Sequence, residues 1–219
     1  MKTLIFSDSH LNGFQEKKYR FIEGIIRDAD NVIINGDFWE GYAYPFDTFL
    51  NSPWKGLFPL LKRKKTVYVY GNHDKPSLSD KRADLFSVEQ VKQYTIKGTN
   101  HTYIIEHGNR LCPFWDEKRS KLTSYVKFEE LVGSTVQKIV VQRLGKKAMQ
   151  AILQPCNKRI KKKLKKELKQ DEIYVCGHTH LAEMDLQNQF INSGMIQYGL
   201  GQYLIFEKGE LTAREEWYQ

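Results

Sequence analysis

Seven residues of types that bind divalent metal ions follow short apolar segments at five places in this 219-residue chain. They are Asp8, His10, Asp37, Asn72, His107, His178 and His180. Imidazole, carboxylate and amide oxygen groups without a thiolate suit cations of the borderline class, such as Mn²⁺, Fe or Zn²⁺. Two adjacent cations of this kind can hold a phosphate, cancel its negative charge and lower the pKa of a bound water. The residues therefore predict a site for hydrolysis of a phosphate ester or anhydride.

The placement of the histidines strengthens this hypothesis. The chain has 6 histidines, and all but His101 stand where an apolar segment ends. A single histidine in such a place is more often structural, but five of six in equivalent places is hard to obtain by chance. His73 lies directly after Asn72, and a histidine with its ordinary pKa near ~6.5 can donate a proton at neutral pH. His73 and Asp37 are therefore the candidate catalytic residues.

An α/β fold is the architecture that would position these residues. Strands are predicted at 2–7, 32–34, 66–70, 92–96, 101–106 and 173–176, then at 182–186, 189–192, 201–207 and 210–217. Residues 14–28 predict an amphipathic helix, and residues 38–61 predict loop and short helix. Because ligands bind at the carboxyl ends of strands in open α/β sheets, the polar clusters are expected to converge there.

The polar clusters form five ordered blocks that resemble the calcineurin-like metallophosphoesterase superfamily. The blocks are Asp8-Ser9-His10, Gly36-Asp37, Gly71-Asn72-His73-Asp74, His107 and Gly177-His178-Thr179-His180. Ile191-Asn192-Ser193-Gly194 also resembles the late Asn-containing turn of that family. The resemblance implies a four-layer α/β/β/α sandwich of two mixed sheets, with residues 1–219 as one domain.

The resemblance also implies a role for each of these residues. Two divalent metal ions are implied, with Mn²⁺ expected ahead of Fe or Zn²⁺. One ion would be bound by Asp8, His10 and His180, the other by Asn72, His107 and His178, and Asp37 would bridge the two. Asn72 and His73 would lie beside the phosphate, where His73 would stabilise the developing charge or protonate the leaving oxygen.

Residues 116–170 interrupt this pattern and predict a helical hairpin that forms a lid over the metal centre. One helix is expected to end at Gly145, and a second to carry Pro155 in its first turn. Ile160, Leu164 and Leu168 recur at i, i+4 and i+8, which gives the second helix one apolar stripe.

The net positive charge of the chain comes from this insertion. Residues 143–169 hold eleven basic residues and one acid, which gives this segment a charge of +10 and leaves −2 for the rest of a chain whose formal net charge is +8. Such a segment is either a solvated helix face or a binding site for a polyanion: an anionic membrane surface, nucleic acid or the phosphates of the substrate. Arg159 and Lys162 in this segment, and Trp39 in an aromatic loop after Asp37, are the further candidates for substrate binding.

Gly36-Asp37-Phe38-Trp39-Glu40, His107-Gly108 and the helical insertion are similar to the UDP-2,3-diacylglucosamine hydrolases of lipid A synthesis, which are peripheral membrane proteins. The chain departs from that subfamily at two positions, since it has His73 where an Arg is usual and Asn109 where an Asp is usual. His73 is the residue of the broader phosphatase and nuclease branches. The sequence therefore leaves the substrate open.

Three functions compete at this stage. The first is hydrolysis of a nucleotide-linked pyrophosphate or related phosphodiester near a membrane, and the second is a nuclease or phosphomonoesterase with a basic nucleic-acid-binding lid. The third is a non-catalytic polyanion-binding protein with a vestigial metal site. An N-terminus without a signal peptide and three cysteines without a CxxC pair predict a cytoplasmic protein. The sequence predicts no oligomeric state.

Overall fold

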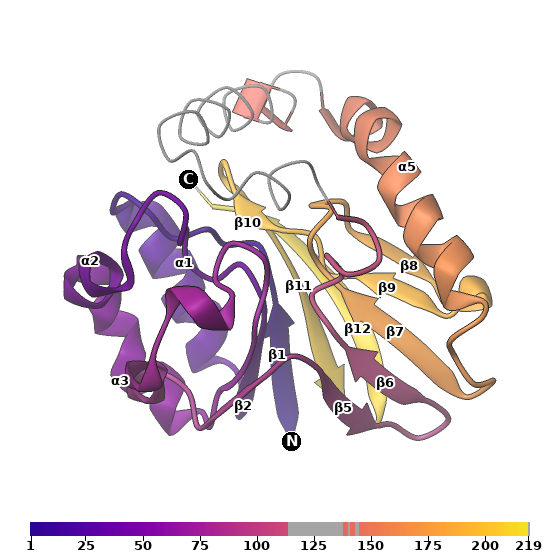
Figure 1. Cartoon of the computed structure of the whole chain (residues 1–219), viewed down its shortest axis with the longest axis horizontal. Helices are drawn as coiled ribbons and strands as arrows, with labels where there is room; N and C mark the ends of the chain where they lie inside the picture. The colour runs from indigo at the N-terminus through magenta and orange to yellow at the C-terminus, as the bar shows by residue number, and fades with distance from the viewer. Residues whose placement is uncertain (114–137, 140, 143–144, 219) are drawn as a thin grey trace.

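The computed structural model describes residues 1–113, 138–139, 141–142 and 145–218. Two mixed β-sheets pack face to face, and helices cover the outer face of each sheet (Figure 1). The termini of the described chain both belong to the same side of this sandwich, since β1 and β12 lie in one sheet. The four-layer α/β/β/α fold expected from the sequence is confirmed.

The first sheet has seven strands in the order β10-β11-β1-β2-β3-β4, with β12 paired to β11. The strands are β1 (Lys2–Phe6), β2 (Asn31–Asn35), β3 (Val67–Val69), β4 (Glu89–Val91), β10 (Ile196–Gln197), β11 (Leu200–Glu207) and β12 (Glu210–Trp217). β1 to β4 run parallel, whereas β11 is antiparallel to β1. β4 has no counterpart among the predicted strands, because Glu89-Gln90-Val91 carries little apolar signal.

The second sheet has five strands in the order β5-β6-β7-β9-β8. They are β5 (Tyr94–Lys97), β6 (Thr102–Ile105), β7 (Glu172–Cys176), β8 (Glu183–Asp185) and β9 (Phe190–Asn192). The three central strands, β6, β7 and β9, run parallel. Parallel strands present their carboxyl ends at one edge, so this sheet, like the first, gathers its strand-end loops in one place.

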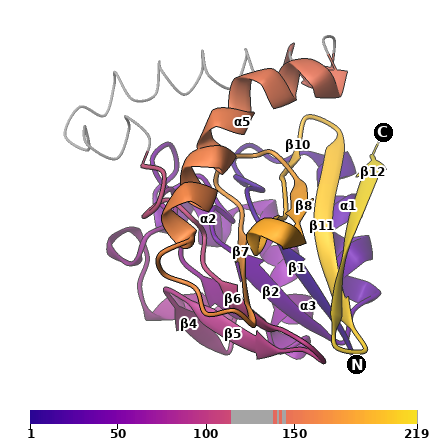
Figure 2. The same ribbon diagram turned by 90° about the vertical axis from the view of Figure 1, so that its right-hand side faces the viewer.

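Helices cover both outer faces. α1 (Glu16–Arg27), α2 (Phe46–Asn51) and α3 (Phe58–Arg63) lie on the first sheet, and α5 (Gly145–Leu164) crosses the second (Figures 1 and 2). Short 3₁₀ turns complete the structure: η1 (Pro53–Leu57), η2 (Pro76–Leu78), η3 (Lys81–Leu85) and η6 (Leu186–Asn188). Among the described residues, no helix is both long and apolar enough to cross a bilayer.

Alternation along the strands builds the interior. In β1, Leu4 and Phe6 face the helices while Ile5 faces the second sheet. In β7, Ile173 and Val175 face the first sheet, whereas Tyr174 and Cys176 face α5. Successive side chains of a strand point to opposite faces, and both faces of these strands are covered. The sequence segments of these strands are therefore apolar at successive positions, without alternation between apolar and polar residues.

α5 differs from the predicted second helix of the insertion at its start. It begins at Gly145 and runs through Pro155, so Pro155 is not in the first turn as predicted. Most of the helix predicted to end at Gly145 lies outside the described residues. Lys146 to Gln154 are mostly good helix formers, and they extend α5 upstream despite the missing proline N–H. Two residues of the predicted apolar stripe are confirmed, because Ile160 and Leu164 are buried against β7 and β9. Leu168 lies beyond the end of α5, and it packs against the same cluster while partly exposed.

The predicted lid is only partly described. Residues 114–137, 140 and 143–144, which hold most of the predicted first helix, lie outside the described residues. α5 itself forms the outer layer on the second sheet, so its role in the fold is to cover that face.

Truncating Ile160 should destabilise the protein because its side chain is fully buried between α5 and the second sheet. Ile160→Ala is expected to lower the free energy of unfolding by about 2–5 kcal/mol, as cavity-forming substitutions do. Urea denaturation followed by circular dichroism measures this change.

Ile152→Ala is the matched control, since Ile152 lies on the same helix with 59% of its surface exposed. Its effect is expected to stay within about 0.5 kcal/mol. Equal losses from the two substitutions would contradict the docking of α5 through its Ile160 face.

Candidate metal centre

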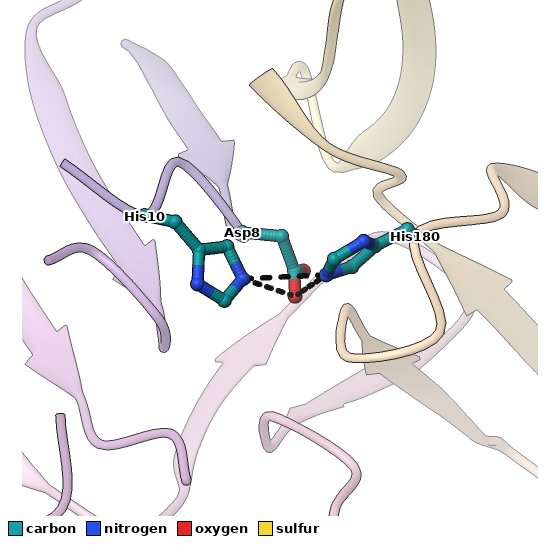
Figure 3. Close-up of side chains that lie close together, drawn as sticks. All are labelled: Asp8, His10 and His180. Atoms are coloured by element: carbon teal, nitrogen blue, oxygen red, sulfur yellow. Dashed lines mark hydrogen bonds and ion pairs between the residues drawn. The ribbon is translucent and has the colours of Figure 1, made fainter. Parts of the chain in front are cut away.

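The structure brings all seven predicted metal-binding side chains to one place. Ligand atoms lie within 4.8 Å of one another in three overlapping groups: Asp8, His10 and His180; His10, Asp37 and His73; and Asp37, His107 and His178. Asn72 joins them, with its Oδ1 2.9 Å from His178 Nδ1 and 3.2 Å from His107 Nε2. Figure 3 shows the first group, in which the two imidazoles approach the Asp8 carboxylate from opposite sides.

These side chains come from the carboxyl ends of five parallel strands of both sheets. Asp8 and His10 follow β1, Asp37 follows β2 and Asn72 follows β3. The second sheet supplies His107 after β6, and His178 and His180 after β7. The site therefore lies where the strand-end loops of the two sheets meet, as the sequence predicted for open α/β sheets.

The backbone at the site is held in an unusual conformation. Nine described non-glycine residues have a positive φ, and five of them are candidate ligands: Asp8 (52°), His10 (40°), Asp37 (52°), His178 (65°) and His180 (59°). A left-handed backbone is disfavoured for residues with a Cβ, and it persists where the surrounding structure over-determines it. The presence of five such residues at one site indicates that the fold tolerates a local cost in backbone energy, which directs these side chains toward the centre.

Two glycines of the sequence blocks are required by close approach. A Cβ on Gly71 would overlap the Asp37 carboxylate, and a Cβ on Gly177 would overlap Ser7 and the Asp8 carboxylate. The loops that carry Asn72 and His178 can therefore reach the first sheet's aspartates only because no side chain intervenes.

Hydrogen bonds fix the tautomer of three histidines. His10 Nδ1 donates to Glu40 Oε2 at 2.9 Å, His107 Nδ1 donates to the Asn35 carbonyl at 2.9 Å, and His178 Nε2 donates to the Cys112 carbonyl at 2.7 Å. In the neutral form of each ring the other nitrogen carries a lone pair directed at the centre. This is how proteins orient metal-binding imidazoles.

One pair of inward-facing atoms consists of two acceptors when His178 is neutral. His178 Nδ1 lies 2.9 Å from Asn72 Oδ1, and the His178 Nε2–H is already donated to the Cys112 carbonyl. Asp8 Oδ1 and Asn72 Nδ2 are buried without a hydrogen bond. Acceptor atoms that face one another at this distance repel unless a proton or a cation lies between them. The donor set therefore fits divalent cations.

The pKa shifts of the buried groups also favour bound cations. Asp8 and Asp37 are buried, and burial raises the pKa of a carboxyl, but His180 beside Asp8 and His107 beside Asp37 hold both pKa values below the usual range. Burial lowers the pKa of His107, yet Asp37 outweighs it and raises that pKa to about 10. Burial and His107 together lower the pKa of His178 to about 3. Two buried carboxylates thus demand positive charge at this point.

Glu40 is a site residue that the sequence reasoning missed. Its carboxylate is 6% exposed and accepts hydrogen bonds from His10 Nδ1 at 2.9 Å and from His73 Nδ1 at 2.7 Å. Burial raises its pKa, but the charge of His73 and the two imidazole hydrogen bonds hold it well below the usual range. The available signal was an acid three residues after Asp37 within Gly36-Asp37-Phe38-Trp39-Glu40.

His73 lies at the rim of the centre. Its backbone N–H donates to Asp37 Oδ1 at 2.9 Å, and its ring packs against His10 and Tyr42 with centroids 4.6 and 4.8 Å away. The side chain keeps 14% of its surface exposed. A ring held on one side by Glu40 and open on another can exchange a proton with a bound molecule.

The candidate substrate-binding residues differ in their exposure and in their distance from the centre. The prediction for Trp39 is wrong, because its ring is fully buried and stacks on Phe49 in the core. Arg159 and Lys162 are exposed on α5, and the Arg159 guanidinium interacts with the Cys112 thiol. The Cys112 carbonyl holds His178, so Arg159 lies close to the rim of the centre.

Comparison with known proteins identifies a family. The model of the calcineurin-like phosphoesterase superfamily domain matches residues 1–212. No curated protein matches the sequence of the chain.

Three solved structures are similar to it at low identity. A novel archaeal phosphodiesterase is 18% identical with a TM-score of 0.49, and the match covers 99% of this chain and 100% of that chain. Yfce, a phosphoesterase from E. coli, is 14% identical with a TM-score of 0.49 and full coverage of both chains, 100% and 100%. A Vps29 variant from Entamoeba histolytica is 12% identical with a TM-score of 0.46, again over 100% of each chain.

Replacing the shared acceptor should loosen the centre. In Glu40→Gln one amide oxygen remains for two imidazole donors, so either His10 or His73 loses its partner and its fixed tautomer. Metal affinity or activity is expected to fall about 10- to 100-fold, as for other residues that orient metal-binding histidines. Calorimetric titration with Mn²⁺ measures the affinity.

The control is Glu16→Gln, because Glu16 is exposed on α1 and pairs only with Arg20 among the described contacts. It is expected to leave Mn²⁺ binding unchanged. Unaltered binding and unaltered activity in Glu40→Gln would contradict the assigned role of Glu40.

Proposed function

This chain belongs to the calcineurin-like phosphoesterase superfamily, and we propose that it hydrolyses a phosphodiester or pyrophosphate with water activated by two divalent metal ions. The observation that carries the proposal is the convergence of seven ligand-type side chains from the ends of five strands, two of them buried carboxylates. Members of this family are hydrolases of phosphate esters with a dinuclear divalent centre.

We assign the side chains to two metal sites that share one carboxylate. Asp8, His10 and His180 form one group, and His107 and His178 form the other with Asn72. Asp37 belongs to groups on both sides, which suits a bridging role. When bound, two such cations lower the pKa of a water and neutralise the charge of the phosphate. Mn²⁺ is the expected ion, with Fe or Zn²⁺ as alternatives.

The chain supplies the proton transfer through His73. Glu40 accepts the hydrogen of His73 Nδ1, and this bond fixes the plane of the ring. Glu40 is ionised, so it also stabilises the protonated form of the imidazole. The opposite nitrogen, Nε2, is the atom that we assign to donating a proton to the leaving oxygen.

The proposal names the type of bond that is cleaved, a phosphodiester or a pyrophosphate, rather than one substrate. The resemblance to UDP-2,3-diacylglucosamine hydrolases favours a nucleotide-linked pyrophosphate, whereas His73 favours the nuclease and phosphomonoesterase branches. Arg159 near Cys112, with Lys162 one turn on, provides cations for a further phosphate of either substrate. The exposed lysines of α5 are proposed to bind an anionic membrane surface or nucleic acid.

Removing the bridging carboxylate should abolish hydrolysis. Asp37→Ala is expected to lower kcat on bis(p-nitrophenyl) phosphate with Mn²⁺ by at least about 100-fold, since charge stabilisation at the reacting centre is lost. Release of nitrophenolate measures the rate. The control is Asp28→Ala. Asp28 is exposed at the end of α1 and pairs with Lys2, which begins β1 at the end of the strand away from the metal-binding loops.

A wild-type protein without activity on phosphomonoesters, phosphodiesters, UDP-linked pyrophosphates and single-stranded nucleic acid would contradict the proposed hydrolysis. It would favour the non-catalytic polyanion-binding function instead. Mn²⁺ and Zn²⁺ should each be supplied in this screen, because the native ion is part of the proposal.

Neutralising the exposed basic face of α5 and the turn after it should weaken binding to anions. Lys158, Lys162, Lys165 and Lys166 are exposed, whereas Lys161 pairs with Glu183 and Asp185 and should be kept. Changing the four exposed lysines to Gln is expected to reduce affinity at least about 100-fold, at roughly 1 kcal/mol for each lysine near an anionic surface.

Flotation with phosphatidylserine vesicles and a gel shift with single-stranded DNA distinguish the two partners. Changing Lys17, Lys55, Lys81 and Lys92, which are exposed on other elements, keeps the same net charge and serves as the control. If the α5 variant and the wild type behave alike in both assays, the basic face is a solvated surface.

A further inference from the structure

A buried polar network connects α5 to the loop that carries two candidate metal ligands. Asn157 is the only residue of the lysine-rich half of α5 that buries an amide side chain, and its exposed surface is 0%. Its Oδ1 accepts a hydrogen bond from Thr179 Oγ1 at 2.6 Å. Its Nδ2 donates to the Leu181 carbonyl at 3.2 Å and to Glu183 Oε2 at 2.8 Å. Asn157 therefore holds the chain on both sides of His180.

A second amide holds the same loop from the opposite direction. Asn192, at the end of β9, donates from Nδ2 to the Gly177 carbonyl at 2.8 Å and to Thr179 Oγ1 at 2.9 Å. Thr179 lies between the two amides and is 1% exposed. The loop from Gly177 to Leu181 is thus fixed at three of its five residues by side chains from two other elements.

The loop needs this support because its backbone is strained. His178 and His180 both have a left-handed φ, 65° and 59°. Such a conformation costs about 1–3 kcal/mol for each residue and persists only where the surroundings hold it. Without the Asn157 amide, the Thr179 hydroxyl and the Leu181 carbonyl would lose a buried partner. The loop would then depend on fewer hydrogen bonds, among them those from Asn192 and the bond from the His178 N–H to Asp8.

We infer that Asn157 is a positioning residue for the metal centre, which makes α5 a structural part of that centre. Asn157 touches neither metal-binding group, but it fixes the residue between His178 and His180. These two histidines belong to different metal sites under the proposed function, on which this inference rests. A change at Asn157 should therefore weaken both sites at once.

The alternative role for Asn157 is to dock the helix and nothing more. Ile160 and Leu164 already dock α5 through apolar contacts, and Lys161 adds ion pairs with Glu183 and Asp185 at 2.7 Å each. A docking residue would affect the stability of the metal-free protein and leave metal affinity unchanged. The two roles therefore differ in a measurable quantity.

Asn157→Leu tests the inference, because it keeps a side chain of similar size and removes both hydrogen-bonding ends. Mn²⁺ is titrated into the full-length metal-free protein by calorimetry, well below the melting temperature of each variant. Affinity is expected to fall about 10- to 100-fold at both sites, as for other residues that orient metal ligands. The melting temperature of the metal-free protein is measured alongside.

Lys161→Gln is the matched control. Lys161 lies on the same helix and shares Glu183 as a partner, but none of its described contacts reaches residues 177–181. It is expected to bind Mn²⁺ as the wild type does. A loss of affinity in Lys161→Gln equal to that in Asn157→Leu would overturn the inference.

A rescue experiment guards against misfolding of the leucine variant. Asn157→Asp keeps an acceptor for Thr179 but places a carboxylate against that of Glu183, so Mn²⁺ affinity is expected to fall. Adding Glu183→Gln restores a donor and acceptor pair between positions 157 and 183 with reversed direction, but not the donor to the Leu181 carbonyl, so part of the lost affinity is expected to return. A cycle of this kind isolates the coupling between the two residues.

Wild-type affinity in both Asn157→Leu and Asn157→Asp would overturn the inference and leave the proposed function standing. A wild-type protein that binds no Mn²⁺, Zn²⁺ or Fe²⁺ would instead overturn the proposed function and this inference with it. The titration of the wild type thus separates the two failures.

Discussion

The structure depends on one electrostatic constraint, the burial of two aspartates side by side at the junction of two sheets. Asp8 and Asp37 are at most 1% exposed, and each follows a strand of the first sheet. A buried carboxylate is costly unless positive charge and hydrogen bonds accompany it. Among the surrounding imidazoles, Asp37 raises the pKa of His107, whereas burial lowers the pKa values of His10 and His178, which favours neutral rings that can act as metal ligands. A pair of cations completes the site.

This constraint accounts for features that would otherwise oppose folding. Five candidate ligands adopt a left-handed backbone, and Gly71 and Gly177 leave no room for a side chain next to the aspartates. The energy for this strain comes from the apolar sandwich, whose strands are covered on both faces. The apolar interior lies away from this edge, so packing there can offset the energetic cost of the strained backbone at the site.

The centre also extends beyond the groups that would bind metal. Glu40 joins His10 to His73, so the orientation of one metal ligand and of the candidate proton donor depends on the same carboxylate. Asn157 joins α5 to the loop between His178 and His180. Glu40 bonds the two histidines directly from the loop after β2, whereas Asn157 acts from α5 through Thr179 and Leu181. Under the further inference, α5 therefore supports the metal centre as well as covering the second sheet.

The residue pattern of the sequence by itself determined the α/β class and the identity of the converging residues, and the resemblance to the metallophosphoesterase family implied the four-layer sandwich. Apolar runs that end in Asp, Asn or His mark buried strands and their loops, because both signals are local and survive in a single sequence. Only the tertiary structure decided the parts of Glu40, Asn157, Trp39 and Pro155. Whether a carboxylate accepts hydrogen bonds from two histidines, an amide supports a loop or an indole packs in the core depends on which distant side chains lie next to it. A helix runs through a proline when packing outweighs the local cost. No local pattern contains that information, since it arises only when the two sheets and their helices are packed together.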